Sequence, residues 1–362
     1  MLEKLHQVCL AFRIADDLIS YEELKTGNIN RTYKVNTMKA DATEKSYIIQ
    51  KVNTYVFKNP VWVMENIDRV TAHIRAKKGG KAALHFHHTA DGKTYVFEED
   101  GFWRLFNYIE SDTYNATTDL DVIRYAGGAF GEFQMLLADF DASELYETIP
   151  DFHNTRKRYE TFESSVLADP CGIVADVKAD VEWLMSVKDH ACSLTDLFAS
   201  GKLPLRVTHN DTKINNVLFD KKDKSALAVI DLDTVMPGLM GNDFGDAIRF
   251  AANFIEEDCP EYEKAGVNLA IFEAFAEGFL KCTGKALTDV EIQTLPLSCF
   301  VLATEQAVRF LDDYILGSPY YKTNYTEHNL VRARCQIALA KDMLAKMDEM
   351  ERIVEECMKK YV

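Results

Sequence analysis

The sequence predicts an α+β protein of two lobes, with a small N-terminal lobe built on an antiparallel sheet and a large, mainly helical C-terminal lobe. The chain has 362 residues, 47% of them hydrophobic, which is enough for two lobes. Up to about residue 107, short β-type runs alternate with turn signals, and after residue 110 long amphipathic segments follow. This change of pattern indicates the fold class.

The N-terminal lobe is expected to contain four strands and one helix. The β-type runs lie at residues 32–35, 46–52, 93–97 and 102–107. The dipeptides Asp91-Gly92 and Asp100-Gly101 are turn signals, and the second is the strongest hairpin signal in the chain. Between the second and third strands, apolar residues recur at mostly helical spacing over residues 59–76.

The C-terminal lobe is expected to be helical apart from one β-type region. The helical pattern covers residues 119–138, 175–199, 267–282 and 327–359. The β-type region has two runs, at residues 216–220 and 226–230, which are separated by the charged turn KKDKS. The short connection at residues 108–112 marks the expected boundary between lobes of residues 1–108 and 109–362, which should share a cleft.

Charge and cysteine usage narrow the class of protein. There are 57 acidic and 41 basic residues, and the net charge of −16 argues against nucleic acid or an anionic membrane as the main partner. The eight cysteines are scattered without a C-x-x-C pair, and no uncharged apolar run approaches 20 residues. We therefore expect a soluble cytoplasmic protein with free thiols. The oligomeric state is open, although a monomer fits the sequence.

The segment LRVTHNDTKINN carries the spacing H-x-D-x-K-x-x-N, which is the outline of a kinase catalytic loop. Phosphoryl transfer needs a carboxylate that accepts the hydroxyl proton, a cation near the γ-phosphate and an oxygen ligand for Mg²⁺. Asp211, Lys213 and Asn216 supply these three groups, whereas His209 is expected to hold the loop by hydrogen bonds.

A second group of acids follows an apolar β-type run fifteen residues after Asn216. Asp231 is the first candidate for a second Mg²⁺ ligand and Asp233 a weaker second, because Mg²⁺ prefers hard oxygen ligands. Clusters of Asn, Asp and Thr also form turns and helix caps without any chemistry. Four matched loop positions, together with a second strand that ends in Asp, favour a phosphoryl-transfer site.

At this point the segments HNDTKINNVLFD, AVIDLDTVMPG and DFGDAIRF resemble the aminoglycoside phosphotransferase family. The segments TGNINRTY, YIIQKVNT, FGEFQ, RFLDDY and EHNLVR resemble its N-acetylhexosamine 1-kinase branch, so that the resemblance covers nearly the whole chain. It implies a bilobal protein-kinase-like fold with ATP and Mg²⁺ between the lobes. It also implies transfer of the γ-phosphate to the anomeric hydroxyl of N-acetylglucosamine or N-acetylgalactosamine, giving the α-1-phosphate.

The resemblance also assigns roles within the catalytic loop. It implies that Asp211 is the general base and also contacts the sugar, and that Lys213 lies near the transferred phosphoryl group. Asn216 and Asp231 would hold Mg²⁺, and Asp243 in DFGD would brace the loop.

For the nucleotide, the resemblance implies a covering loop that contains Gly27 and Asn30, although this chain has no G-x-G-x-x-G. In IIQK, Gln50 and Lys51 cannot both face the phosphates because strand residues alternate between faces. The resemblance favours Gln50. The ion-pair partner of Lys51 on the following helix could be Glu65 or Asp68.

The adenine base should meet the backbone of the connection around Asn107, Tyr108 and Ile109, with Leu218 as an apolar floor.

For the sugar, the resemblance points to Arg309, Tyr320 and Asn28, although the relatives are expected to carry His at the position of Asn28. Tyr114 and Asn115 are further candidates for a sugar or nucleotide contact.

Other interpretations stay open from the sequence. The same chemistry could act on homoserine, choline, an aminoglycoside or another sugar, and a catalytically inactive nucleotide sensor is a third hypothesis. The preference between the gluco and galacto epimers has no sequence signal. Residues 85–88, His-Phe-His-His, resemble a metal-binding tract but have no partner Cys or His at ligand spacing, so a solvated loop or strand end is the favoured interpretation.

Overall fold

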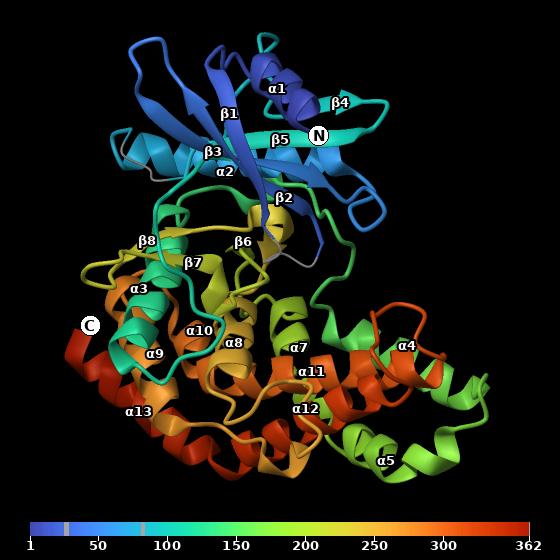
Figure 1. Cartoon of the computed structure of the whole chain (residues 1–362). Coiled ribbons are helices and arrows are strands. Elements are labelled where there is room, and N and C mark those ends of the chain that lie inside the picture. Colours follow the sequence, from blue (N-terminus) through green and yellow to red (C-terminus); the bar gives the residue numbers. More distant parts are fainter. Residues whose placement is uncertain (25–28, 81–83, 362) are drawn as a thin grey trace.

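The computed structural model describes residues 1–24, 29–80 and 84–361, and over these residues the chain forms two lobes (Figure 1). The N-terminal lobe contains an antiparallel five-stranded sheet in the order β1-β2-β3-β5-β4. Its strands are β1 (Asp17–Leu24), β2 (Arg31–Met38), β3 (Glu44–Val52), β4 (Val96–Glu98) and β5 (Gly101–Asn107).

Two helices cover the two faces of this sheet. Helix α1 (Leu2–Ala11) packs on the outer face, where Leu5 and Val8 share a core with Trp103 and Leu105 of β5. Helix α2 (Pro60–Lys77) packs on the inner face in a core that also contains residues of the C-terminal lobe, such as Leu232. Because residues of β5 alternate between faces, Trp103 and Leu105 point outward while Phe102 and Arg104 point toward the C-terminal lobe.

The predicted N-terminal elements are present, with two additions. Neither α1 nor β1 was predicted. Strand β1 is a largely exposed edge strand, so its sequence lacks apolar alternation. The run predicted at residues 93–97 pairs only over β4. The predicted hairpin joins β4 to β5, with Glu98 opposite Gly101.

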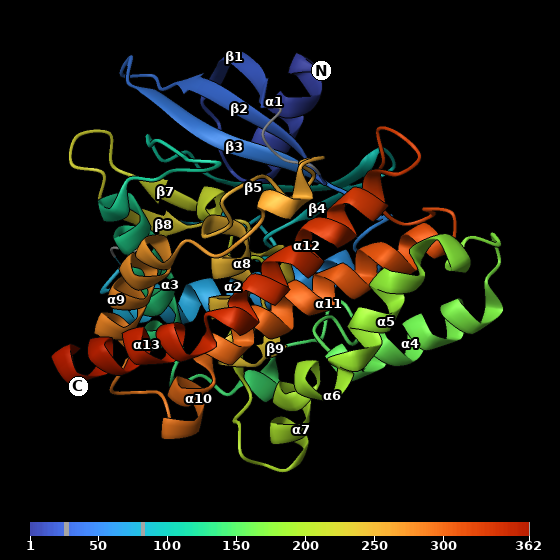
Figure 2. The same ribbon diagram turned by 90° about the horizontal axis from the view of Figure 1, so that it is seen from below.

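The C-terminal lobe is built around α11 (Leu295–Ile315), which is buried along most of its length and packs against α4, α8 and α12. Figure 2 shows α11 and α12 running side by side across the lobe. The α-helices of this lobe are α3 (Leu120–Leu136), α4 (Thr155–Ala168), α5 (Lys178–Ser186), α6 (Lys188–Ala191), α7 (Ser193–Ala199), α8 (Met240–Ala251), α9 (Leu269–Thr283), α10 (Asp289–Gln293), α11, α12 (His328–Ala345) and α13 (Met347–Tyr361). A Cβ at Gly245 of α8 would lie 2.4 Å from the Ser298 carbonyl oxygen, so glycine lets α8 approach α11 closely.

Two short two-stranded sheets belong to this lobe. They are formed by β6 (Arg206–Thr208) with β9 (Met236–Gly238), and by β7 (Val217–Phe219) with β8 (Ala226–Val229). The pair β7-β8 corresponds to the predicted β-type runs. The short 3-10 turns are η1 (Ala142–Glu144), η2 (Val174–Val177), η3 (Ile214–Asn216), η4 (Leu232–Thr234) and η5 (Tyr262–Lys264).

Two long helical predictions were wrong in their continuity. The segment predicted at residues 175–199 is divided into a 3-10 turn and three short helices, and the segment at 327–359 breaks between α12 and α13 near Lys346. Neither break is marked by Gly or Pro. The predicted fold class is confirmed: a five-stranded antiparallel sheet above a helical lobe is a protein-kinase-like fold. The division at residues 108 and 109 stays a prediction.

Candidate active site

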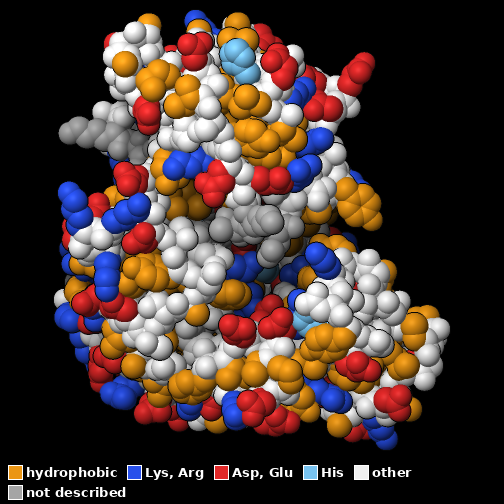
Figure 3. All heavy atoms as spheres, in the orientation of Figure 1, with side chains coloured by type: hydrophobic (Ala, Val, Ile, Leu, Met, Phe, Trp, Pro, Cys, Tyr) orange, Lys and Arg blue, Asp and Glu red, His pale blue; other side chains and the backbone are white. Residues whose placement is uncertain are grey.

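A cleft between the lobes has a volume of about 680 Å³, part of it open to solvent, and both lobes contribute to its walls. Figure 3 shows the surface hollowed at this level, with Lys and Arg side chains inside the hollow. The lining residues are Ile29, Asn30, Thr32, Gln50 and Phe57 from the N-terminal lobe, and Asp211, Lys213, Asn215, Asn216, Asp231, Asp233 and Thr234 from the C-terminal lobe.

The catalytic loop, defined here as residues 209–216, is held from below by carboxylates of α8. The two oxygens of Asp243 accept hydrogen bonds from the backbone N–H groups of His209, at 2.9 Å, and Asn210, at 2.7 Å. The Gln134 amide of α3 donates a third bond to Asp243 at 2.6 Å. Burial raises the pKa of Asp243, and these donors offset part of that rise.

A second carboxylate of α8, Asp246, extends this support. It accepts the Thr212 N–H at 3.0 Å, and the Thr212 hydroxyl donates to the Asp243 carbonyl at 2.6 Å. Asn210 adopts a left-handed backbone conformation with φ of 63°, which is uncommon for residues other than glycine. The loop conformation is therefore fixed by buried polar contacts within one lobe.

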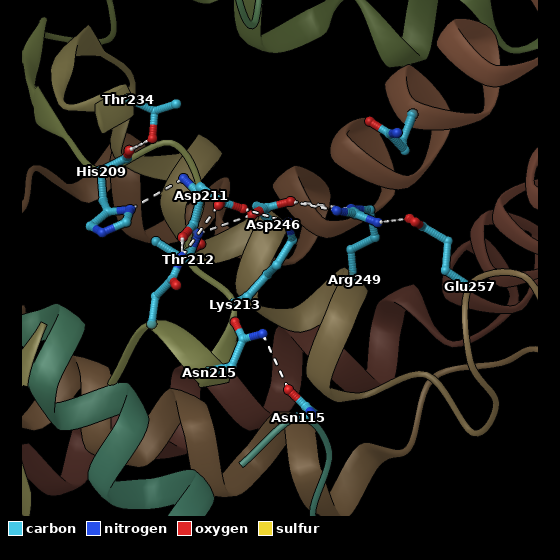
Figure 4. A network of polar contacts seen from close by, with 12 residues as sticks. Asn115, His209, Asp211, Thr212, Lys213, Asn215, Thr234, Asp246, Arg249 and Glu257 are labelled. Atoms are coloured by element: carbon cyan, nitrogen blue, oxygen red, sulfur yellow. Dashed lines mark hydrogen bonds and ion pairs between the residues drawn. The ribbon is translucent and has the colours of Figure 1, made fainter. Parts of the chain in front are cut away.

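His209 occupies a fully buried position in the loop. Its Nε2 lies 2.9 Å from the Ile230 carbonyl, and its ring meets the rings of Phe130 and Phe133 edge-on. The His209 carbonyl accepts a hydrogen bond from the Thr234 hydroxyl at 2.7 Å (Figure 4). This environment suits a residue that connects the loop to the neighbouring strand.

Asp211, Lys213 and Asn216 come together at the floor of the cleft. The Lys213 Nζ lies 2.9 Å from one oxygen of Asp211, and the Asn216 amide lies 3.3 Å from the other. The same amide donates to the Asp211 carbonyl at 2.8 Å. Burial lowers the pKa of Lys213, but Asp211 and Asp246 more than compensate, so that its pKa is raised and it stays a cation.

Asp231 follows β8 and faces the cleft, where solvent reaches it although protein surrounds its other sides. Its backbone is left-handed, with φ of 60°, a strained conformation that is concentrated at functional sites. Burial and the nearby Asp233 and Asp211 raise its pKa to about 6. Within the described part of the chain its carboxylate has no hydrogen-bond or ion-pair partner, unlike those of Asp211 and Asp233.

These donors fit Mg²⁺. The Asp231 carboxylate and the side-chain oxygen of Asn216 are hard ligands, and Mg²⁺ is typically held by one or two carboxylates with water and phosphate completing its shell. Three carboxylates converge here, with Lys213 paired to Asp211 and Arg104 paired to Asp233. A divalent cation at Asp231 would neutralise the remaining charge.

Asp233 does not fit the weaker metal-ligand role predicted for it. One of its oxygens pairs with Arg104 of β5, and the other accepts the Asn30 amide at 2.6 Å. Both oxygens are therefore engaged by the N-terminal lobe. Asn30 in turn accepts the Asn53 N–H at 2.9 Å, so that it connects the start of β2 with the end of β3.

The structure settles which residue of β3 faces the cleft. Gln50 points inward, accepting a hydrogen bond from Arg104 at 2.8 Å and donating one to Thr32 at 3.0 Å. Lys51 lies on the outer face, 5.5 Å from the centre of the Trp103 ring. The predicted ion pair of Lys51 with α2 was wrong, because Glu65 pairs with Arg69 and Asp68 with His88.

The connection after β5 is partly occupied by backbone bonds. The N–H of Asn107 donates to His85 and that of Tyr108 to Ser46, and the Ile109 carbonyl accepts the Ser111 hydroxyl at 3.0 Å. Leu218 is half-buried on β7, next to Phe219, which forms a β-bridge with Asp112.

A polar network continues from the catalytic loop along α8. Arg249 pairs with Asp246 at 2.7 Å and with Glu257, as Figure 4 shows. The neighbouring helix α11 contributes Arg309, whose guanidinium lies 5.5 Å from the Phe152 ring centre and 5.7 Å from that of Tyr321.

The predicted Tyr320 side chain is 71% exposed, and its ring meets that of Tyr321 edge-on. Tyr321 rather than Tyr320 therefore makes the ring contact with Arg309. Of the other candidates, Tyr114 packs its ring edge-on against Phe219, and Asn115 accepts a long hydrogen bond from Asn215 at 3.4 Å. Gly27 and Asn28 lie outside the described residues.

The histidines of residues 85–88 do not form a metal site. His85 contacts Arg75 at 2.9 Å and His88 contacts Asp68 at 3.0 Å. In the described part of the chain no group of three or more His, Cys, Asp or Glu residues is arranged to hold a metal ion.

Several site residues were missed by the sequence analysis. Gln134, Asp246 and Arg249 lie inside motifs that were noted, FGEFQ and DFGDAIRF, and their polar side chains at buried helical positions were a usable signal. Arg104 had no signal, because a single arginine in a strand does not reveal its ion-pair partner in the other lobe.

Comparison with known proteins places this geometry in context. The profile of the phosphotransferase enzyme family matches residues 20–277. Similar solved structures include a microcompartment-associated aminopropanol kinase, with a TM-score of 0.62 and 17% identity over 95% of this chain and 98% of that one.

A spectinomycin phosphotransferase in complex with ADP and spectinomycin has a TM-score of 0.59 and 12% identity, over 96% of this chain and 99% of that one. An ethanolamine kinase from Plasmodium vivax has a TM-score of 0.56 and 14% identity, over 88% and 82% of the two chains. At these identities the structural similarity shows the fold. Among the helices that the structure describes, none has the length and apolarity needed to cross a bilayer.

Proposed function

The chain belongs to the phosphotransferase enzyme family, and from this premise we propose that it transfers the γ-phosphate of ATP, with Mg²⁺, to an alcohol of a small molecule. The acceptor we propose is the anomeric hydroxyl of N-acetylglucosamine or N-acetylgalactosamine, which would give the α-1-phosphate. The alternative is the same chemistry on another alcohol, such as homoserine, choline, an aminoglycoside or another sugar.

The observation that carries the kinase proposal is the convergence of Asp211, Lys213, Asn216 and Asp231 at the floor of one cleft. Asp211 orients the acceptor hydroxyl and takes its proton while the hydroxyl oxygen attacks the γ-phosphorus and ADP leaves. Lys213 stabilises charge on the transferred group. Asn216 and Asp231 would hold Mg²⁺, which when bound supplies further charge neutralisation at the phosphates.

Support for a sugar acceptor comes from two motifs that the structure brings together. Asp313 of RFLDDY accepts the backbone N–H groups of Tyr320 and Tyr321, at 2.9 and 3.0 Å. It also accepts the amide of Asn329 of EHNLVR at 2.8 Å. These two segments resemble the N-acetylhexosamine 1-kinases and jointly hold the loop that carries both tyrosines beside Arg309.

The charge of this region argues against a cationic acceptor. Arg309 packs against the Phe152 ring, and Arg158 donates to the Phe152 carbonyl at 3.1 Å. Among the described residues, neither arginine has a carboxylate within ion-pair distance. Burial and the nearby Arg309 lower the pKa of Arg158, as expected for two close cations. The nearby Glu305 carboxylate raises the pKa of both arginines and offsets part of their charge. Choline or an aminoglycoside would add another positive charge beside these arginines, whereas a neutral sugar would accept hydrogen bonds from them.

Phosphorus NMR of the reaction product tests the proposal. The protein is incubated with ATP, Mg²⁺ and, separately, N-acetylglucosamine, N-acetylgalactosamine, homoserine or choline. We expect an anomeric sugar phosphate with one or both sugars. Product from only a non-sugar acceptor would overturn the acceptor assignment, and Mg²⁺-dependent ATP binding without product from any acceptor would favour the nucleotide-sensor hypothesis.

A further inference from the structure

We propose that Arg104 is the positioning residue that connects the lobes across the cleft, by fixing Asp233 and through it the loop that presents Asp231. The proposal rests on the proposed function, in which Asp231 is a ligand of Mg²⁺. In protein kinases a β3 lysine pairs with a glutamate of the N-terminal helix, and that ion pair orders the nucleotide site. Here the inward β3 residue is the neutral Gln50, so this pair is absent from the described cleft.

Arg104 lies where such a cation is needed. It is directly opposite Gln50 in the β3-β5 ladder and points to the same face of the sheet. Its side chain is only 2% exposed. Its Nε donates to Gln50 at 2.8 Å, and its Nη1 pairs with Asp233. The Gln50 amide donates onward to Thr32, so the guanidinium is oriented by strands β2 and β3.

Asp233 is the acceptor for the N-terminal lobe. Its side chain is 5% exposed, and its second oxygen accepts the Asn30 amide at 2.6 Å. It lies in the η4 turn directly after Asp231. Two residues of the N-terminal lobe, one in β5 and one directly before β2, therefore hold one acid of the C-terminal lobe, two positions from the candidate metal ligand.

The electrostatics explain why Arg104 is needed. A buried carboxylate that loses its partner is strongly unfavourable. Without Arg104, the negative charge of Asp233 would have no cation beside it. It would then repel the nearby carboxylates of Asp231 and Asp211 more strongly. The loop would move to expose Asp233 to water, and Asp231 would move with it.

The test compares Arg104→Met, Arg104→Lys, Asp233→Asn and the double variant Arg104→Met/Asp233→Asn. Binding of Mn²⁺ in the presence of a non-hydrolysable ATP analogue is measured by electron paramagnetic resonance, and Tm is measured on the metal-free protein. We expect Arg104→Met to weaken Mn²⁺ binding about tenfold, the lower end for residues that orient metal ligands. Arg104→Lys should recover part of this loss.

The double variant supplies the second readout. Since the Met substitution alone leaves an unpaired buried acid, Asp233→Asn in that background should recover at least half of the lost Tm. Lys51→Met is the matched control, because Lys51 lies on the same sheet but on its outer face, and Mn²⁺ binding should not change.

A further variant, Gln50→Ala, keeps the ion pair between Arg104 and Asp233 and should weaken Mn²⁺ binding less than Arg104→Met does. This variant keeps the test usable if Arg104→Met folds poorly.

Unchanged Mn²⁺ binding in folded Arg104→Met, an equal loss in Lys51→Met, or no recovery of Tm in the double variant would each overturn the proposal. These readouts do not use turnover. A wild-type protein that phosphorylates no acceptor would therefore count against the proposed function while the role of Arg104 is still decided.

Discussion

The two walls of the cleft are built differently. The C-terminal wall, the catalytic loop, is held inside its own lobe. Asp243 and Asp246 of α8 accept hydrogen bonds from its backbone N–H groups, and Gln134 of α3 donates to Asp243. The N-terminal wall is held across the cleft, where Asn30 and Arg104 both reach Asp233. The difference indicates that the groups we propose for proton and phosphoryl transfer are assembled before substrates bind, whereas the wall proposed to face the nucleotide depends on how the lobes meet.

The largest expected effect isolates the chemistry of the C-terminal wall. Asp211→Asn keeps the size of the side chain but removes the proton acceptor, so kcat should fall about 10³-fold, within the range for general-base catalysis. Steady-state kinetics with the acceptor identified by phosphorus NMR measures this, with ATP binding by calorimetry and Tm expected to stay near wild type. Asp223→Asn, in an exposed turn, is the control. A variant with near-wild-type kcat would remove Asp211 from the mechanism.

The next effect breaks the support under that wall. Asp243→Ala leaves the N–H groups of His209 and Asn210 and the Gln134 amide without an acceptor. Since each unsatisfied buried group costs about 1–3 kcal/mol, the free energy of unfolding should fall by about 3 kcal/mol or more. Urea denaturation checks this value. A loss below 1 kcal/mol would show that the loop is not held by Asp243.

This difference between the walls also explains what could be predicted from sequence. The catalytic loop is one contiguous segment whose chemistry depends on local spacing, so Asp211, Lys213 and Asn216 were located together. The N-terminal wall depends on pairs more than 100 residues apart, such as Arg104 with Asp233, and no local pattern encodes such a pair. Strand β1 was missed because an exposed edge strand needs no apolar alternation.

Strand alternation and local spacing left two answers at two places, and the resemblance, not the spacing, favoured Gln50, which the structure places toward the cleft. Gln50 and Lys51 are consecutive, and the contact of Gln50 with Arg104 and the packing of Lys51 on Trp103 show which one faces outward. In the same way SPYY contains two adjacent tyrosines, and the ring contact of Arg309 falls to Tyr321. Sequence motifs located these segments but did not orient them.

A smaller effect concerns the loop that carries Tyr320 and Tyr321, which we propose to lie beside the acceptor. Asp313→Ala removes the acceptor of the Tyr320 and Tyr321 N–H groups, so KM for the acceptor should rise about tenfold, the equivalent of roughly one hydrogen bond. KM for ATP should not change, because Asp313 is not among the residues that line the cleft with Asp211 and Asp231. Initial rates with each substrate varied in turn provide the measurement, and equal rises in both KM values would show general misfolding instead.

The smallest effect is a pH dependence in the N-terminal lobe. Burial and the neighbouring His85 lower the pKa of His87 to about 4. The unfolded chain protonates this residue near pH 6.5, so the unfolding free energy should fall as the pH falls from 6.5 toward 4. Because the ring is only partly buried, the loss at pH 5 should be about 1 kcal/mol. His87→Phe should reduce the pH dependence of Tm between pH 7 and 5; an identical slope would contradict this assignment.

Hydrogen exchange of the wild-type protein tests the contrast between the walls most directly. Amide exchange is followed by mass spectrometry for peptides that cover residues 206–217 and 230–236, without ligand and with Mg²⁺ and a non-hydrolysable ATP analogue. We expect slow exchange in the catalytic loop under both conditions, and faster exchange around Asp231 and Asp233 that slows when the nucleotide binds. A catalytic loop that becomes protected only with nucleotide would contradict a preassembled C-terminal wall.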